Sequence, residues 1–192
     1  MPANTPIKVC SRASVLMGGS PISSFDEGTA EADVVDAMYE DIARAALTST
    51  RWRFATNQQV LNRLAAAPTS RYDAAYQMPS DLLMLSAVTV NDDPIIYDTY
   101  GDKVYCDTTT EEVVVADYIY RASESSWPSY FTLAVEFQVA AMLSLSIARD
   151  ANLAQMMDQQ GERQMIKARR LDSQQQTTRK LMTSRFIAQR RS

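Results

Sequence analysis

Apolar residues recur at helical spacing in several stretches of the chain. In residues 29–49 an apolar stripe repeats every three or four positions, and carboxylates occupy the opposite face. Residues 5–17 and 151–176 follow the same period, although the apolar face of the second is thin and is broken by Gly161. The pattern therefore predicts amphipathic helices at about 5–17, 29–49 and 151–176.

The stretch 128–148 has helical character but no polar face. From Phe131 to Ala148, 13 of 18 residues are apolar, and they fall on all sides of a helical wheel. A helix of this kind is buried in protein or in lipid, and this run is shorter than the roughly 20 apolar residues that a bilayer span needs. We expect the central buried helix of a soluble domain, with Glu136 either paired or at a subunit contact.

Short alternating runs typical of strands occupy the region from about 51 to 122. Trp52 and Phe54 alternate with arginines, which predicts a short strand with one buried face. Further strands are expected at 72–77, 82–90, 95–100, 103–106 and 112–121, with tight turns at 91–94 and at Gly101-Asp102. The last of these strands is expected to close an antiparallel β-meander.

Together these elements predict an α+β fold that is mainly α. We expect a helical bundle around the central buried helix, with a small antiparallel β-meander inserted at about 51–122. Residues 1–176 would form one domain, and 177–192 an extended C-terminal arm. The expected core aromatic and aliphatic anchors are Trp52, Phe54, Trp127, Phe131, Phe137 and Leu143.

Charge is unevenly distributed along the chain. Residues 151–192 carry nine basic and three acidic residues, net +6, whereas residues 1–150 carry ten and twenty, net −10. A basic segment attached to an acidic body is typical of an interaction tail.

The last sixteen residues combine five basic residues with four large apolar ones and no acid. Burial of the four apolar side chains contributes roughly 6–12 kcal/mol, and ordering sixteen backbone residues costs roughly 16–32 kcal/mol. The segment must therefore pair its backbone with a partner or act multivalently. The expected anchors are Arg179, Lys180, Leu181, Met182, Arg185, Phe186, Ile187, Arg190 and Arg191.

The composition restricts the chemistry. Histidine is absent, and the two cysteines are far apart in the sequence. A nucleophile activated by histidine and a structural zinc site are therefore excluded. We expect no catalytic residues, no metal site and no cofactor.

Three alternatives remain open beside a structural role. A nucleic-acid-binding protein would use the basic 151–192 region and the run Arg51–Phe54 as a stacking platform. A hydrolase without histidine would need a carboxylate pair such as Glu136 with Asp117. A scaffold or assembly chaperone would help a larger assembly to form and would be absent from the finished assembly.

Several segments, in order along the chain, resemble the head–tail adaptor proteins of tailed bacteriophages and gene transfer agents, of the tail-tubular-protein-A type. The resemblance covers nearly the whole chain, although Arg51 stands where a glycine is usual. It rests on ASVLMGGSPISSFDEGTAEADVV (13–35), TSTRWRFAT (48–56), YQMPSDLL (76–83), VTVNDDPIIYDTYGDKVYCD (88–107), YIYRASESSWPSYFTLAVEFQVAAMLSLSIARD (118–150) and RLDSQQQ (170–176).

The resemblance implies a virion protein of the head–tail interface, assembled in the host cytoplasm. It implies a dodecameric ring on the portal protein that extends the DNA channel and receives the next tail, nozzle or terminator protein. DNA would pass without specific binding, which the acidic body suits, and no membrane would be involved. The arm would reach the portal, and subunit or tail contacts are expected at Asp92, Asp93, Tyr97, Tyr100 and Glu136.

Overall fold

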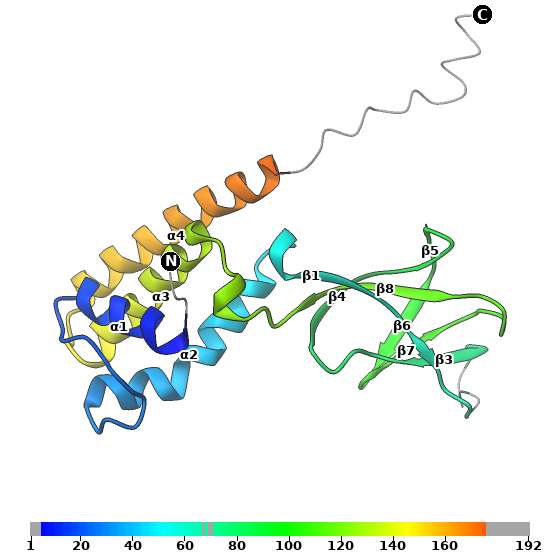
Figure 1. Cartoon of the computed structure of the whole chain (residues 1–192), viewed down its shortest axis with the longest axis horizontal. Helices are drawn as coiled ribbons and strands as arrows, with labels where there is room; N and C mark the ends of the chain where they lie inside the picture. Colours follow the sequence, from blue (N-terminus) through cyan, green and yellow to red (C-terminus); the bar gives the residue numbers. More distant parts are fainter. Residues whose placement is uncertain (1–4, 67, 69–70, 176–192) are drawn as a thin grey trace, which may run out of the picture.

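The structure is a computed structural model, and it describes residues 5–66, 68 and 71–175. These residues form a helical body and a β body, placed end to end along the long axis of the molecule (Figure 1). The chain enters the β body after residue 55 and returns to the helical body after residue 120. The two crossings lie side by side, because the first strand of the β body pairs with its last.

Three of the four helices that the structure describes begin at a side-chain cap, whereas the helix that follows Pro128 begins without one. The side chains of Thr5, Thr29 and Asp150 each accept a hydrogen bond from a backbone N–H of the following first turn. Such caps satisfy amide groups that have no partner inside the helix. The bounds are α1 Pro6–Leu16, α2 Ala30–Thr48, α3 Ser129–Ser146 and α4 Ala151–Gln174.

Helix α3 lies at the centre of the helical body, and α1, α2 and α4 all pack against it. Phe131, Val135 and Leu143 on this helix are fully buried. The expectation of a helix buried on all sides is wrong, however, because Leu133 and Leu145 are 37% and 57% exposed. The three neighbouring helices leave strips of α3 open, so its apolar residues serve both the core and the surface.

Gly161 lies where α4 packs against Phe137 and Gln138 of α3. A Cβ atom built at Gly161 would lie 3.4 Å from Gln138 Cγ and 3.5 Å from Phe137 Cβ. The glycine is buried within α4, so it does not interrupt the packing face as the sequence pattern indicated. It allows the two helices to approach each other.

The β body contains two four-stranded antiparallel sheets, with strand orders β1-β8-β4-β5 and β2-β3-β7-β6. Apolar residues from both sheets share one core, including Val88, Val104, Val114 and Tyr118. The sheets therefore cover each other. The strands are β1 Thr56–Val60, β2 Asn62–Arg63, β3 Ala74–Gln77, β4 Leu82–Val90, β5 Asp93–Pro94, β6 Tyr97–Tyr100, β7 Lys103–Cys106 and β8 Val114–Tyr120.

Continuous chain joins the two sheets at both edges. Only Leu61 separates β1 from β2, and its N–H donates to Val114 O. On the other edge Ile95 lies between β5 and β6, and its N–H donates to Val88 O. The β body is thus a sandwich of two sheets linked by continuous chain, with β1, β5, β2 and β6 as its edge strands.

The predicted fold class is wrong in its proportions and in its β topology. The chain is a mixed α/β protein with four helices and two four-stranded sheets among the described residues, and not a helical bundle with a small meander. The hairpin turns lie where the sequence placed them, with positive φ at Asn91, Asp92 and Gly101. The final strand β8, however, does not close a meander with β6 and β7. It pairs with β1 and β4 in the first sheet, and the apolar faces of the two sheets bury each other.

The expected strand at Trp52–Phe54 is also absent. Residues Arg53–Ala55 form a 3-10 turn, η1, and β1 begins one residue later. Trp52 is buried and Phe54 is partly buried. The turn directs both rings into the helical body, so alternation with arginine reflects a short helical turn and not a strand.

Gly161 provides a test of the α3–α4 packing. We expect Gly161→Ala to raise the free energy of unfolding by about 0.5–1 kcal/mol, because alanine has the higher helix propensity and its methyl group fits at ordinary contact distance. Gly161→Leu should lower it by about 1–3 kcal/mol through overpacking. Urea denaturation measures both, and a destabilising alanine would contradict the observed spacing.

Candidate docking surfaces and the joint between the bodies

A buried carboxylate ties the chain that leaves β8 to helix α2. Glu124 opens the 3-10 turn η2 (Glu124–Ser126), shortly after β8, and is 6% exposed. Its Oε1 accepts hydrogen bonds from Arg121 Nη2 at 2.6 Å and from Tyr39 Oη at 2.9 Å. Since Tyr39 belongs to α2 and Arg121 follows β8, one carboxylate holds both elements.

Arg121 extends this joint across the surface of α2. Its guanidinium binds both carboxylate oxygens of Glu40, with Nη2 2.9 Å from Oε2 and Nε 3.1 Å from Oε1, and lies 5.5 Å from the Trp127 ring centroid. Burial opposes the charge on Arg121, but hydrogen bonds to Glu40 and Glu124 outweigh it and raise the pKa of Arg121. The hydrogen bond from Arg121 lowers the pKa of Glu40.

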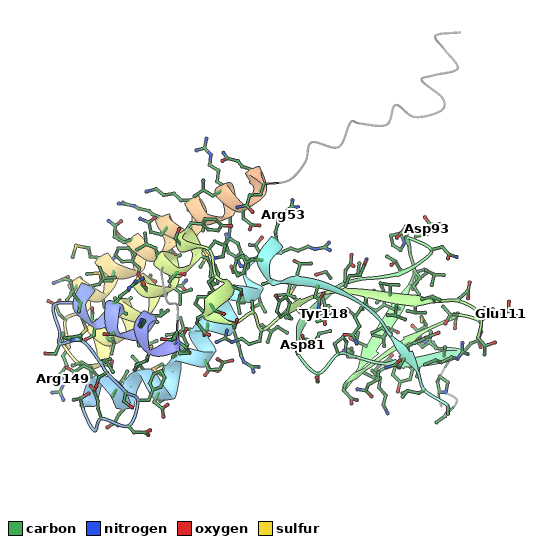
Figure 2. All side chains as sticks on the ribbon, in the orientation of Figure 1. Arg53, Asp81, Asp93, Glu111, Tyr118 and Arg149 are labelled. Atoms are coloured by element: carbon green, nitrogen blue, oxygen red, sulfur yellow. The ribbon has the colours of Figure 1, made fainter. Side chains whose placement is uncertain are left out.

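A second carboxylate fixes the C-terminal end of α4. Asp172 is 5% exposed, and its oxygens accept from Arg53 N at 3.1 Å and from Tyr130 Oη at 3.0 Å. Burial and this hydrogen bond raise the pKa of Tyr130 to about 12. The end of α4 is therefore tied to the first crossing between the bodies; Arg53 is labelled there in Figure 2.

The expected core aromatics gather beside this crossing. Phe131 is packed against the rings of Trp52, Phe54 and Trp127, with centroid distances of 5.0, 4.9 and 4.9 Å. The indole N–H groups of Trp52 and Trp127 donate to the backbone oxygens of Ala46 and Ala122. With their rings inside the helical body, Trp52 and Phe54 do not form a stacking platform for nucleic acid.

Of the remaining expected core residues, Leu143 is fully buried and Phe137 is only partly buried.

Glu136 lies in the helical body and makes an ion pair with α1. It is 5% exposed, and its Oε1 accepts from Arg12 Nη1 at 3.1 Å. Burial raises the pKa of Glu136, and the contact with Arg12 offsets this only in part. Within the described chain Glu136 is therefore a paired residue. Asp117, proposed as its catalytic partner, binds Arg51 and Gln58 on the β body, so the two carboxylates have separate partners.

The far end of the β body carries exposed acids. The β4–β5 turn contributes Asp92 and Asp93, and the loop before β8 contributes Glu111 and Glu112, all exposed. Pairing of Val90 with Val114 brings these two loops to the same end, and Figure 2 labels Asp93 and Glu111 there. We call these four residues the acidic tip.

A cluster of tyrosines lies on the sheet formed by β6 and β7. Asp98 accepts hydrogen bonds from the hydroxyls of Tyr72 and Tyr100 and binds Arg71 Nη2 at 3.1 Å. The hydrogen bond from Tyr72 lowers the pKa of Asp98. The Tyr105 ring lies 5.4 Å from that of Tyr100, which is 51% exposed. Such half-polar rings are enriched at protein contacts; Tyr97, also expected in a contact, is partly buried against the β core.

Sequence reasoning missed Glu124, Asp172, Arg71 and Asp98, because their partners are distant in the chain. One signal was present for Asp172. A carboxylate in the last turn of a helix is unfavourable next to the negative end of the helix dipole, so its position there indicates a specific partner. The nine residues expected to anchor the arm, from Arg179 to Arg191, lie outside the described residues.

The described residues contain no group of three His, Cys, Asp or Glu residues placed to hold a metal ion. None of their helices has the length and apolar character needed to cross a membrane. No protein-family profile matches the sequence, and no curated protein matches it as a relative. What the geometry offers is a set of surfaces held at fixed positions.

Glu124 and Glu136 should respond oppositely when glutamine replaces the carboxylate. Glu124→Gln should lower the free energy of unfolding at pH 7 by about 2–3 kcal/mol, since it weakens a buried charged hydrogen bond to Arg121. Glu136→Gln should raise it by up to about 1 kcal/mol, because burial disfavours the ionised form.

The pH dependence follows from the raised pKa of Glu136. The folded state holds the Glu136 proton more tightly than the unfolded state does, so stability is lost as pH rises from the ordinary value of 4.5 through the folded pKa. Urea denaturation at pH 4.5 and pH 7 should show a smaller loss in Glu136→Gln than in the unaltered protein. An equal loss would contradict the assignment.

Proposed function

We propose that this protein is a structural virion component, the head-to-tail adaptor of a tailed bacteriophage or gene transfer agent. Twelve copies would form a ring on the portal protein, extend the DNA channel and receive the next tail component. The proposal rests on the ordered sequence resemblance and on one structural observation. Two bodies are joined by two chain segments that buried carboxylates hold on the helical body, and Ile119 of β8 is buried in the helical core.

The fixed relation matters because an adaptor must align two larger assemblies. Glu124 joins α2 to the end of β8, and Asp172 joins α4 to the chain that enters β1. Both connecting segments are therefore anchored on the helical body by buried, hydrogen-bonded carboxylates, which need their partners in place. A fixed arrangement of this kind suits a protein that functions through its shape.

The two ends of the molecule differ in chemistry, as the proposed role requires. The acidic tip and the tyrosine cluster around Asp98 offer a charged, aromatic face on the β body. On the helical body, α4 ends at Gln174, and the basic segment 177–192 follows it in the sequence. We assign the β-body face to contacts with a neighbouring subunit or the tail, and the segment to the portal.

The role of the segment can be tested in a pull-down with the portal protein. Deletion of 177–192 should abolish portal binding and leave the far-UV circular dichroism nearly unchanged, since the described helices and strands do not include it. Full-length Leu181→Ser/Phe186→Ser should weaken binding at least about tenfold through lost apolar burial.

A matched control lies at the opposite end of the molecule. Asp92→Lys/Asp93→Lys reverses charge on the acidic tip, where both residues are exposed, and should leave portal binding intact. Portal binding that survives the deletion, or that depends on the acidic tip, would contradict the assignment of the segment.

A second candidate function, nucleic-acid binding, is favoured by the outer face of α4. Arg163, Lys167 and Arg170 are exposed and spaced at i, i+4 and i+7, so they line one side of the helix. The segment 177–192, which follows α4 in the sequence, adds five basic residues. Basic residues clustered in this way match the phosphate backbone of a nucleic acid.

Salt dependence separates the two candidate functions. A DNA-binding protein would lose affinity steeply between 50 and 200 mM salt, by roughly tenfold or more for every few phosphate contacts. The variant Arg163→Ser/Lys167→Ser/Arg170→Ser would reduce the slope of log affinity against log salt concentration. We expect the adaptor to show negligible duplex affinity at physiological salt, because residues 1–150 carry a net charge of −10. Fluorescence anisotropy with labelled duplex DNA measures this, and tight binding at 150 mM salt would favour the second candidate.

A further inference from the structure

A groove runs along the helical body between α2 and α4. Both helices pack against α3, which forms the floor, and two adjacent hollows of about 430 and 580 Å³ share Ala45 and Gln138. We call this feature the α2–α4 groove. At one end its walls approach each other, with Ser49 Oγ 4.0 Å from Met165 Sδ.

The lining of the groove suits bulky apolar side chains with basic neighbours. Small residues alternate with larger apolar ones along its floor and walls, and Leu145 and Ile166 are 57% and 64% exposed at its margin. Its charged lining residues are Asp158, Glu162 and Arg169, net −1. The apolar lining comprises Ile42, Ala45, Ala141, Met142, Leu145 and Ala154.

We infer that in the free protein the C-terminal segment 177–192 folds back into the α2–α4 groove of its own chain. The inference goes beyond the proposed adaptor role, because it concerns the chain before any partner is bound. The apolar residues of the segment would occupy the hollows, and its basic residues would face Asp158 and Glu162.

Charge and composition favour this occupant. The segment has five basic residues, no acidic residue and four large apolar side chains, whereas the groove offers apolar hollows beside two carboxylates. An amphipathic segment laid in an apolar groove is a common recognition mode. The ordering cost that the segment cannot meet alone is reduced when a groove supplies burial for its anchors.

Length and connection favour the same chain over a second copy. Arg169, the last groove residue on α4, precedes the end of that helix at Gln174 by five residues, or about 7.5 Å. Residues 175–178 are enough to reverse the chain, and 179–192 would span up to about 46 Å as an extended chain. That length reaches past both Glu162 and Asp158 on an antiparallel course, and an extended segment adds no helix. A tethered segment also has an effective concentration on the order of millimolar.

Disulfide trapping in the full-length chain tests this placement. Ser184→Cys is combined with Ile166→Cys, which lies in the groove, or with Lys167→Cys, which is exposed outside its lining. The two positions differ by one residue of tether and about 100° around α4. The native Cys10 and Cys106 are buried, and burial raises the pKa of Cys10 to about 12, so neither competes.

We expect the Ile166→Cys pair to form an intramolecular disulfide about tenfold faster than the Lys167→Cys pair under mild oxidation. Adding Phe186→Ser should bring the two rates together, because it removes an apolar anchor. Rates that are equal from the start would overturn the inference.

Disulfide-linked dimers would overturn it as well. Mixing the Ser184→Cys single variant with the Ile166→Cys single variant, and measuring the mass of the products, detects a segment that occupies the groove of a second copy. We expect dimer formation to be negligible at micromolar protein. Efficient dimer trapping would assign the groove to a neighbouring subunit instead.

Discussion

The hydrogen-bonded carboxylate of Glu124 fixes the point at which the chain from the β body re-enters the helical body. A buried charge is tolerated only with its partners in place. Because Tyr39 lies on α2 and Arg121 follows β8, Glu124 is satisfied only when the segment after β8 is docked on α2. Beside this contact, Ile119 of β8 is buried in the core of the helical body and Leu83 of β4 packs against it.

Asp172 applies the same constraint at the end of α4. It accepts hydrogen bonds from the backbone of Arg53 and from the hydroxyl of Tyr130, so the chain that enters the β body, the start of α3 and the end of α4 meet at one point. The C-terminal end of α4 therefore lies at the first crossing between the bodies. The acidic tip lies at the opposite end of the β body (Figure 2).

Much of the local structure could be predicted from the sequence, because it depends on neighbouring residues. Caps at Thr5, Thr29 and Asp150 and the helical period place the four helices within a few residues, and the turns at Asn91-Asp92 and Gly101-Asp102 lie where expected. The misplaced elements depend on distant contacts. Trp52 and Phe54 alternate with arginine as in a strand, yet packing against Phe131 selects a 3-10 turn.

The candidate surfaces also divide into those that the sequence indicates and those that only the fold assembles. The acids of the turn at 91–94 and the basic composition of 177–192 are properties of the sequence. The tyrosine cluster around Asp98 and the α2–α4 groove combine residues that are far apart in the chain, and no local pattern indicates them.

The sequence by itself determined which segments are helices, where the hairpins turn, and that a basic apolar segment follows an acidic body. These are set by backbone propensity, capping and composition, which act over a few residues. Only the tertiary structure decided that β8 pairs with β1 and β4, that the two sheets share one core, and that Glu124 and Asp172 hold the two connecting segments on the helical body. Strand partners and buried ion pairs depend on which surfaces exclude water together, and that is a property of the whole fold.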